Sequence, residues 1–398
     1  MTSENYYTIP RSEIKSRISK LKVFLKKKEY EAALVLSIPE LYYYSGFGGD
    51  GAIYIPLEGN PVHLVKRNLH LAQKHSQIHD IRLFGKRSKI FETLEVPSRH
   101  KIAIEKDILP YSFVKFLELT GKDIELVNGS FIFRSIRSVK SKFEVDQIEQ
   151  AASLVDKSFE YCTDIANSQM TEIELATKLD SWLLNNGHNG YITTYGFNTA
   201  LLNYSYVVSS LSSTLNIHFT PISGYGLSLK YPFGPSRQKL EKNQPFMVDT
   251  CGNHLGYISD TTRTFVCGRF DKETYEQLNA LIQIKNFIKQ KLKPKINLGN
   301  LYNEVLELSR ELKIDDQFMG TNIDRVAFIG HGVGLTLDDL PVFYSKGSDL
   351  TPGNTLACEP KFFILNKKIL GIEDTYVITE SGNRLLTKSP NYFEISTS

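Results

Sequence analysis

The stretch PFMVDTCGNHLGYISDTTRTFVCG, Pro245–Gly268, contains two apolar strand-like runs separated by glycines. Gly252 and Gly256 allow a tight turn between these runs, so the pattern predicts a β-hairpin. Asp249 follows the first apolar run, and Asp260 comes eleven residues later. A hairpin would bring the two carboxylates face to face, where they would repel each other strongly if both were buried and ionised. A divalent cation bound between them would remove that repulsion.

Three further side chains that can bind a metal stand in similar apolar surroundings. Glu359 lies in NTLACEPKFF and Glu373 in LGIEDTYVIT, and acids are poor guests in buried strands. His331 is framed by glycines at the start of GHGVGLTLDDLP. Any of the three taken alone reads as a turn residue or a surface charge. With Asp249 and Asp260 they make a set of carboxylates and one imidazole that can hold two ions such as Mn, Co, Fe or Zn.

The segments before residue 136 alternate between short apolar runs and helical patterns, which indicates an α/β domain. Helical periodicity predicts helices over 14–30, 69–79 and 111–119, with a break in the chain at Pro39. The strand-like runs cover 33–36, 51–57, 61–66, 81–85, 101–106 and 124–128. The sequence therefore predicts a first domain over residues 1–135.

A different pattern begins at residue 136 and continues to residue 398. A long apolar stripe runs from Ile148 to Phe159, and Thr171 with Glu174 forms a helix start signal. From Gly190 onward strands and glycine turns dominate, interrupted by helical patterns over 272–291 and 301–312. Helices packed against a curved, mainly antiparallel sheet make this second domain α+β.

Composition excludes several classes of protein. The chain has 398 residues, with 47 Lys and Arg against 44 Asp and Glu, so its net charge of +3 provides no broad basic field for nucleic acid. The basic run Lys20–Lys28 carries apolar residues at helical intervals and reads as the solvated face of a helix. No apolar run approaches the ~18 residues of a membrane span, and the polar N-terminus does not resemble a signal peptide. The four cysteines form no CxxC pair, so a reducing cytoplasm is expected.

As a set, DTCGNHLGYISDTTRTF, GHGVGL, ACEPKFF and GIEDTYVITESG resemble the metal-ligand motifs of the creatinase, prolidase and aminopeptidase P family. The resemblance implies an α+β chain, with a pita-bread catalytic domain after a creatinase-type N-terminal α/β domain. It extends over nearly the whole chain, because RSIRSVKSKFEVDQIEQA resembles the family's inter-domain helix entry. The spacings of eleven residues from Asp249 to Asp260 and fourteen from Glu359 to Glu373 suit its prolidase-like branch.

The roles of individual residues follow from this resemblance. It implies two divalent metal ions with the ligands Asp249, Asp260, His331, Glu359 and Glu373. Glu359 would also take a proton from a metal-bridged hydroxide and pass it to the leaving nitrogen. Arg263 would fix a carboxylate through bidentate hydrogen bonds. The implied activity is cleavage of the bond before proline in dipeptides or short peptides, by a homodimer.

The chain departs from the family pattern at two histidines. Asp338 and Asp339 stand where the family carries His-Glu, and a carboxylate cannot donate a hydrogen bond to an oxyanion unless it is protonated. Asp338 is therefore open to several roles: it binds a substrate cation, is held protonated, or bonds a backbone N–H. The second family histidine falls at Tyr231-Pro232, and His218 is the nearest replacement.

Two other functions remain open at this level. One is a non-peptidase of the same fold, a creatinase-like or ectoine-type hydrolase or a metal-dependent lyase, acting on a small cationic compound. Asp338 beside a small pocket would suit that substrate. The other is a binding module without catalysis, like the histone-chaperone relatives of the fold. Retention of five costly buried polar groups argues against the binding module.

Overall fold

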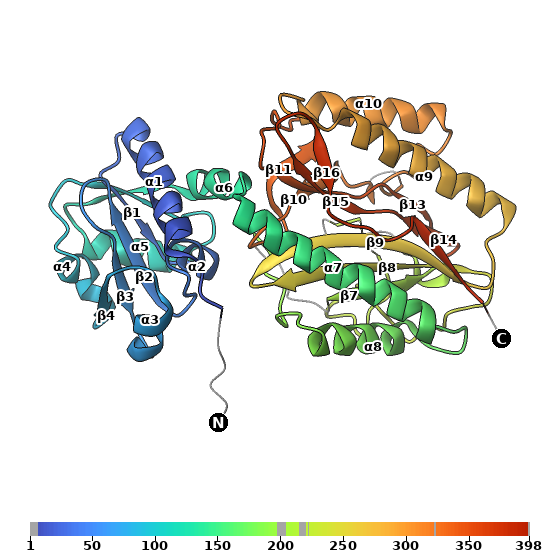
Figure 1. Cartoon of the computed structure of the whole chain (residues 1–398), viewed down its shortest axis with the longest axis horizontal. Coiled ribbons are helices and arrows are strands. Elements are labelled where there is room, and N and C mark those ends of the chain that lie inside the picture. The colour runs from blue at the N-terminus through green and yellow to red at the C-terminus, as the bar shows by residue number, and fades with distance from the viewer. Residues whose placement is uncertain (1–6, 197–203, 215–219, 222, 322–323, 397–398) are drawn as a thin grey trace. The chain divides into compact units, whose positions relative to one another are not determined.

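The computed structural model describes residues 7–196, 204–214, 220–221, 223–321 and 324–396 of the chain (Figure 1). The chain forms two compact units. Of the described residues, the first unit contains those up to Arg137 together with Tyr195 and Gly196, and the second contains the others from Ser138 onward. In the described part of the chain, no helix is both long enough and apolar enough to cross a membrane.

The N-terminal unit is built around one six-stranded sheet in the order β4-β3-β2-β1-β5-β6. Its middle strands β1, β2 and β3 pair antiparallel, whereas β4, β5 and β6 add to the sheet in parallel. All six predicted strands are present: β1 (Ala32–Val35), β2 (Gly51–Pro56), β3 (Val62–Val65), β4 (Asp80–Leu83), β5 (Lys101–Ile104) and β6 (Glu125–Asn128).

The helices of this unit are α1 (Arg11–Lys28), α2 (Ile38–Ser45), α3 (Leu69–His75), α4 (Ile90–Thr93), α5 (Tyr111–Thr120) and α6 (Ser130–Ser138). On α1 the apolar residues Leu21 and Leu25 are buried, while Lys26–Lys28 are exposed, so the basic run is a solvated helix face as predicted. The predicted break at Pro39 is wrong. Pro39 lies in the first turn of α2. The backbone N–H groups of a first turn have no partner within the helix, so the N–H that proline lacks is not missed there.

Burial of His63 is expected to make the N-terminal unit less stable in acid. It lies on β3 with 0% of its surface exposed, and its Nδ1 is 3.0 Å from Ser76 Oγ. Burial lowers the pKa of His63 from 6.5 to about 4. Above pH 6.5 the imidazole is neutral in both the folded and the unfolded chain. Between pH 6.5 and 4 only the unfolded chain binds the proton, so stability falls with pH by on the order of 3 kcal/mol.

This loss is measured by urea unfolding of the full chain at several pH values, in the wild type and in His63→Asn, which has no titratable ring. We expect the variant to be less stable at pH 7 but to lose less further stability on acidification to pH 5. Equal slopes against pH in the two proteins would contradict the assignment to His63.

The C-terminal unit contains two larger sheets and a small hairpin. One sheet has the order β11-β10-β12-β15-β16, the other has the order β17-β9-β8-β7, and β13 pairs with β14. Apart from the parallel pair β17 and β9, these strands pair antiparallel, as predicted. The strands are β7 (Ser205–Ser209), β8 (Pro245–His254), β9 (Tyr257–Cys267), β10 (Phe328–Gly332), β11 (Asp339–Tyr344), β12 (Thr355–Cys358), β13 (Lys361–Ile364), β14 (Lys368–Gly371), β15 (Asp374–Ile378), β16 (Asn383–Leu385) and β17 (Tyr392–Ile395).

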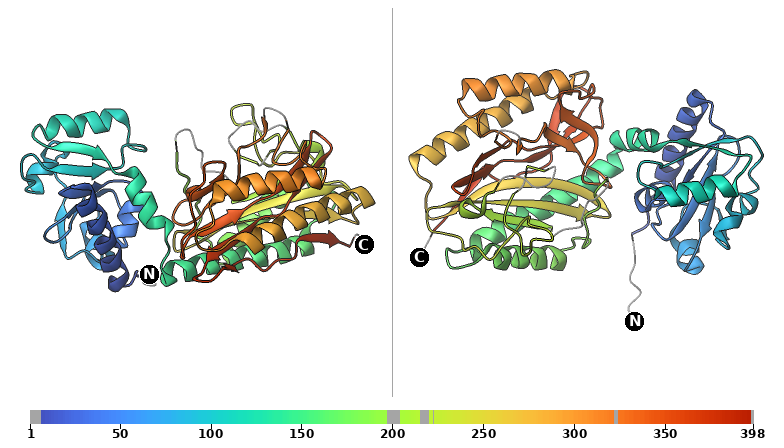
Figure 2. Two further views of the ribbon diagram at one scale, coloured as in Figure 1. Left: turned by 90° about the horizontal axis from the view of Figure 1, so that it is seen from above. Right: turned by 180° about the vertical axis from the view of Figure 1, so that it is seen from behind.

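Two pairs of helices cover these sheets from opposite sides (Figure 2). The pairs are α7 (Lys142–Ile165) with α8 (Glu172–Asn185) and α9 (Lys272–Lys291) with α10 (Leu298–Glu311). The predicted start signal of α8 is confirmed, because Thr171 and Glu174 form a complete capping box. Apolar residues of α7 and α8 pack on β7, β8 and β9, while those of α9 and α10 pack on the sheet around β12. The strand surfaces between the two helical layers therefore face each other inside the unit.

Candidate metal centre

The predicted hairpin is formed by β8 and β9, and it carries the first two candidate ligands. Its last pair is His254 with Tyr257, and the turn residues Leu255 and Gly256 both have positive φ, as a two-residue hairpin turn requires. Asp249 pairs with Thr262, and Asp260 pairs with Cys251. The carboxylates are therefore diagonal neighbours on one face of the hairpin, rather than direct partners as expected from the sequence.

Glycine in this hairpin serves a second purpose at position 252. A Cβ on Gly252 would lie 2.2 Å from the carbonyl oxygen of Ala151 on α7. Side chains alternate along a strand, so Thr250 and Gly252 face α7 while Asp249 and Cys251 face the other way. The close approach of α7 thus covers one side of the hairpin and leaves the two acids on the side that meets β10 and β12.

The glycines around His331 are required by close backbone contacts. A Cβ on Gly330 would lie 2.2 Å from the carbonyl oxygen of Ala357, and one on Gly332 would lie 2.1 Å from that of Leu340. His331 Nδ1 is 3.2 Å from the carbonyl oxygen of Gly332, which can only accept a hydrogen bond. In the neutral imidazole Nδ1 therefore carries the hydrogen, and Nε2 keeps the lone pair that can bind a metal.

The two glutamates lie where strands end or begin. Glu359 directly follows β12, and its N–H donates to the carbonyl oxygen of Ile329 on β10 at 2.9 Å. Glu373 directly precedes β15, and its N–H donates to the carbonyl oxygen of Thr262 on β9 at 3.0 Å. The Thr262 hydroxyl also donates to Glu373 Oε2 at 2.7 Å. The bond of Glu359 lies within the sheet that contains β10 and β12, whereas the two bonds between Glu373 and Thr262 join that sheet to the sheet of β9.

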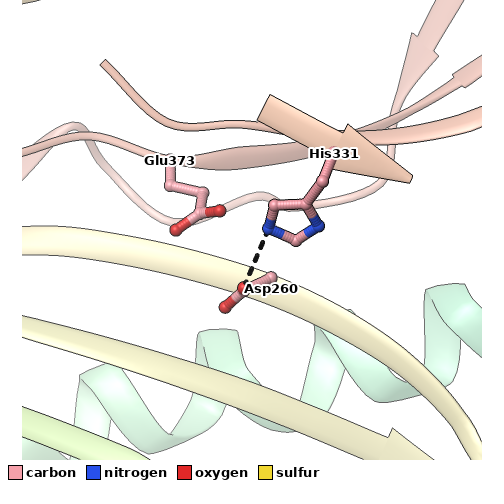
Figure 3. Close-up of side chains that lie close together, drawn as sticks. All are labelled: Asp260, His331 and Glu373. Atoms are coloured by element: carbon pink, nitrogen blue, oxygen red, sulfur yellow. Dashed lines mark ion pairs between the residues drawn. The ribbon is translucent and has the colours of Figure 1, made fainter. Parts of the chain in front are cut away.

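The five predicted ligands converge in one buried cluster. The exposed fractions of these residues are 3% for Asp249, 6% for Asp260, 7% for His331, 3% for Glu359 and 0% for Glu373. His331 Nε2 lies 3.7 Å from Asp260 Oδ2 and 3.6 Å from Glu359 Oε1. Figure 3 shows Asp260, His331 and Glu373 directed toward a common point between β9 and the strands above it.

A lysine that the sequence reasoning did not single out completes this cluster. Lys361 is fully buried, and its Nζ lies 2.7 Å from Glu359 Oε2, 3.0 Å from Asp249 Oδ2 and 3.5 Å from Glu373 Oε2. Two-residue alternation in ACEPKFF, which places Glu359 and Lys361 on the same side of an extended segment, was the signal that could have identified it.

Burial and mutual repulsion dominate the electrostatics of the cluster. Burial raises the pKa of Glu373 to about 8, against the lowering effect of the Lys361 ammonium. Burial also raises the pKa of Asp260 well above its usual value, and the nearby Glu373 and Asp249 carboxylates add to the effect. Burial alone would lower the pKa of His331, but Asp338, Glu359 and Glu373 together raise it. One lysine does not neutralise four carboxylates, so the cluster favours binding of an additional cation.

The geometry indicates where that cation fits. Glu359 Oε1 and Glu373 Oε1 are buried and have no hydrogen-bond partner. Ligand atoms of Asp260, His331 and Glu373 all lie within 4.8 Å of one another. Imidazole together with carboxylate oxygens suits Mn, Fe, Co or Zn. The residues present therefore fit a divalent ion on this side of the cluster.

Arg263 supports the cluster through a neighbour of Glu373. Its Nη2 donates to Asp374 Oδ1 at 2.6 Å, and its Nη1 donates to the carbonyl oxygen of Glu373 at 2.5 Å. Its Nε donates to the carbonyl oxygen of Pro390 at 2.6 Å. Arg263 therefore contacts a carboxylate, as expected, but not through the expected pair of hydrogen bonds. A single nitrogen reaches Asp374, because the rest of the guanidinium is used to hold backbone carbonyls on either side.

The chain differs from the family pattern at two positions where the family carries a histidine. Asp338, which stands at one of them, is not part of the cluster. Asp338 is exposed just before β11, close enough to contribute to the raised pKa of His331. Its neighbour Asp339 is buried and accepts a hydrogen bond from the N–H of Leu340 at 2.9 Å. His218, the suggested replacement for the second histidine, lies outside the described residues. Tyr231, at the corresponding place in the sequence, stacks edge to face with Phe233.

Comparisons with known proteins agree with this architecture. Residues 17–139 match the creatinase/prolidase N-terminal domain. The Xaa-Pro dipeptidase of Pyrococcus horikoshii is 24% identical over 376 residues, which are 94% of this chain and 97% of that protein. The solved structure of a dipeptidase from Mycobacterium ulcerans has a TM-score of 0.81 at 18% identity, covering 98% of this chain and 100% of that chain. That of an X-Pro aminopeptidase from Thermotoga maritima has a TM-score of 0.76 at 20% identity, covering 92% and 98%.

These similarities confirm the predicted α+β class, with a creatinase-type N-terminal domain before a pita-bread catalytic domain. Residues 146–380 match the model of metallopeptidase family M24, which is more than half of the chain. The buried acids and the histidine of the cluster all lie within this matched region. The chain therefore belongs to metallopeptidase family M24.

Proposed function

We propose that this protein is a divalent-metal-dependent hydrolase that cleaves the peptide bond before proline in dipeptides or short peptides. The observation that carries the proposal is the convergence of Asp260, His331, Glu359 and Glu373 around two unpartnered carboxylate oxygens. Membership of family M24 and similarity to Xaa-Pro dipeptidases over 94% of the chain support the choice of substrate.

One residue of the cluster, Glu359, would both hold an ion and handle a proton. Asp260, His331, Glu359 and Glu373 would hold a divalent cation, which when bound supplies the positive charge that activates water and polarises the scissile carbonyl. Glu359 is positioned to move the proton. Its Oε2 accepts a hydrogen bond from Lys361, which fixes the carboxylate and leaves Oε1 to take a proton and deliver it to the leaving nitrogen.

Several finer expectations belong to this proposal. The resemblance to prolidases implies a second ion, whereas Asp249 faces the Lys361 ammonium. A reducing compartment suits the chain because Cys162, Cys251, Cys267 and Cys358 are free and buried. Homodimerisation, which the resemblance also implies, is measured by light scattering of the purified chain.

The proposed function is tested by turnover of metal-reconstituted protein on a panel of Xaa-Pro dipeptides, longer Xaa-Pro peptides and matched Xaa-Ala peptides. We expect cleavage only before proline, loss of activity on chelation and recovery on adding back a divalent metal. Cleavage that persists after exhaustive removal of metal would contradict the proposal, and so would protein that binds no metal at all.

A second candidate function rests on Asp338. Its carboxylate is exposed close to the cluster, where the family carries a histidine, and an anionic group there favours a cationic substrate. A small cationic compound, consumed by hydrolysis or by a lyase reaction, is therefore the alternative to a peptide. Betaine-like and amidine compounds in the same panel distinguish the two. Consumption of one of them without cleavage of any Xaa-Pro peptide would favour the second candidate.

A further inference from the structure

Lys361 places its ammonium group among buried carboxylates that would otherwise need another cation to balance their charge. Its Nζ lies within 3.5 Å of oxygens from Asp249, Glu359 and Glu373. A buried ammonium is costly unless charged partners surround it, and here the partners are three of the predicted metal ligands. The lysine is thus part of the cluster rather than a neighbour of it.

The two glutamates divide their oxygens between two sides of the cluster. Glu359 Oε2 and Glu373 Oε2 face Lys361, together with Asp249 Oδ2. Glu359 Oε1 and Glu373 Oε1 accept no hydrogen bond, and Glu359 Oε1 lies 3.6 Å from His331 Nε2 on the other side of the cluster. The cluster therefore has two cation positions that share both glutamates, one of them occupied by an ammonium.

The surrounding strands are shaped to admit the lysine side chain. Lys361 begins β13 and pairs with Gly371 at the end of β14. A Cβ on Gly371 would lie 3.3 Å from Lys361 Cγ and 2.7 Å from Met247 Sδ, so a glycine at this position leaves room for both side chains. The backbone of Lys361 is held from the other side, because its carbonyl accepts from the N–H of Met319 at 2.9 Å.

We infer that the Lys361 ammonium takes the place of one of two metal ions, so that this centre binds a single divalent cation between Asp260, His331, Glu359 and Glu373. The inference rests on the proposed metal dependence but not on the substrate. The Lys361 ammonium supplies positive charge to Asp249 through an ion pair and donates a hydrogen bond to Glu359, but an ammonium cannot accept an electron pair from a ligand as a metal ion does. The centre then has one Lewis-acidic position, with Lys361 neutralising the carboxylates of the other.

Counting bound ions tests this inference directly. Metal-free full-length protein is dialysed against Mn²⁺, and the bound metal is measured by mass spectrometry, with electron paramagnetic resonance to detect exchange coupling between neighbouring ions. We expect one ion per chain and the signal of an isolated Mn²⁺. Two ions per wild-type chain, with exchange coupling, would overturn the inference, because Lys361 would then have left the cluster.

Substitutions at Lys361 provide the complementary measurement. Lys361→Met removes the charge at similar length and should free Asp249 for a second ion, which raises the count to two, while Lys361→Arg keeps a cation and should bind one. Lys368→Met is the matched control, since Lys368 is also mostly buried but pairs with Glu273 at 3.6 Å, away from the cluster. A count of one in folded Lys361→Met would contradict the inference. Near-ultraviolet circular dichroism verifies folding, and the wild-type count remains decisive if that variant does not fold.

The outcomes also separate this inference from the proposed function. One bound ion without turnover of any Xaa-Pro peptide would leave the inference standing and refute the substrate. Two bound ions together with Xaa-Pro turnover would refute the inference and support the proposed substrate. No bound ion in the wild type would refute both.

Discussion

Replacing His331 with alanine is expected to reduce Xaa-Pro turnover by about 10³-fold or more. His331 supplies the one imidazole among the five candidate ligands, and its Nε2 lies within 3.7 Å of carboxylate oxygens of Asp260 and Glu359. Loss of this ligand would weaken metal binding and with it the several kcal/mol of transition-state stabilisation that a catalytic metal contributes. Both kcat/KM and the metal content of the protein should fall.

His254→Ala is the matched control for this prediction. His254 lies at the end of the same hairpin that carries Asp260, and its Nδ1 is 3.0 Å from Gln147 Oε1. It makes no contact with the cluster in the described interactions, so we expect activity within a few-fold of the wild type and unchanged metal content. Full activity and full metal content in His331→Ala would show that the histidine is not a ligand.

Replacing Arg263 with methionine is expected to destabilise the C-terminal unit by about 3 kcal/mol. The Arg263 and Asp374 side chains are each 1% exposed, and removing one partner of a buried pair leaves the other charge uncompensated. Lys285 Nζ, 3.1 Å from Asp374 Oδ2, and the Thr387 hydroxyl remain and limit the loss. Urea unfolding at pH 7 measures the change in the free energy of unfolding.

The pH dependence of this pair has a defined sign. Burial alone would raise the pKa of Asp374, but Arg263, Lys285 and hydrogen bonds lower it below 3.8. The stabilisation is therefore fully present above about pH 4 and is lost as the pH falls through the lowered pKa. Arg384→Met is the control, because its pair with Glu149 is 44% and 29% exposed and should change stability by less than about 1 kcal/mol. Equal losses in the two variants would contradict the prediction.

The buried Arg263 side chain also connects the stability of the fold to the candidate metal centre. Its Nη1 donates to the backbone carbonyl of Glu373, so Arg263→Met should loosen the position of a predicted ligand as well as destabilise the fold. Lysine at this position should not restore the wild-type behaviour, because an ammonium cannot reach Asp374 and several carbonyls with the geometry of a guanidinium.

Local sequence patterns were sufficient to predict most elements of the fold. The helical period over 272–291 matches α9, and the capping box at Thr171 marks the start of α8, since each depends on interactions within a few residues. The prediction at Pro39 is wrong because a proline breaks a helix interior but also suits the first turn of a helix. The helix that contains Pro39 has only eight residues, too few for its period to decide between the two.

The identities of the candidate ligands were also accessible from the sequence. Asp249, Asp260, His331, Glu359 and Glu373 stand out because charged and polar groups in apolar strands need partners, and their spacing resembles a known family. The contacts that each carboxylate makes in the folded chain could not be predicted from the sequence. The register of the hairpin makes Asp249 a diagonal neighbour of Asp260, and residue types alone do not fix that register. Arg263 contacts Asp374 because packing brings together two segments that lie 111 residues apart in the chain.

The sequence by itself determined the two-domain organisation, the family and the set of side chains that can bind a metal, because these depend on local periodicity and on residue type. Only the tertiary structure decided that the amino group of Lys361 lies among three of those carboxylates. The pairing of β13 with β14 and the missing side chain at Gly371 direct the lysine inward, and burial from solvent then makes its charge part of the centre. The long-range packing of strands, which no short stretch of residues encodes, thus determines how many positive charges the protein itself supplies.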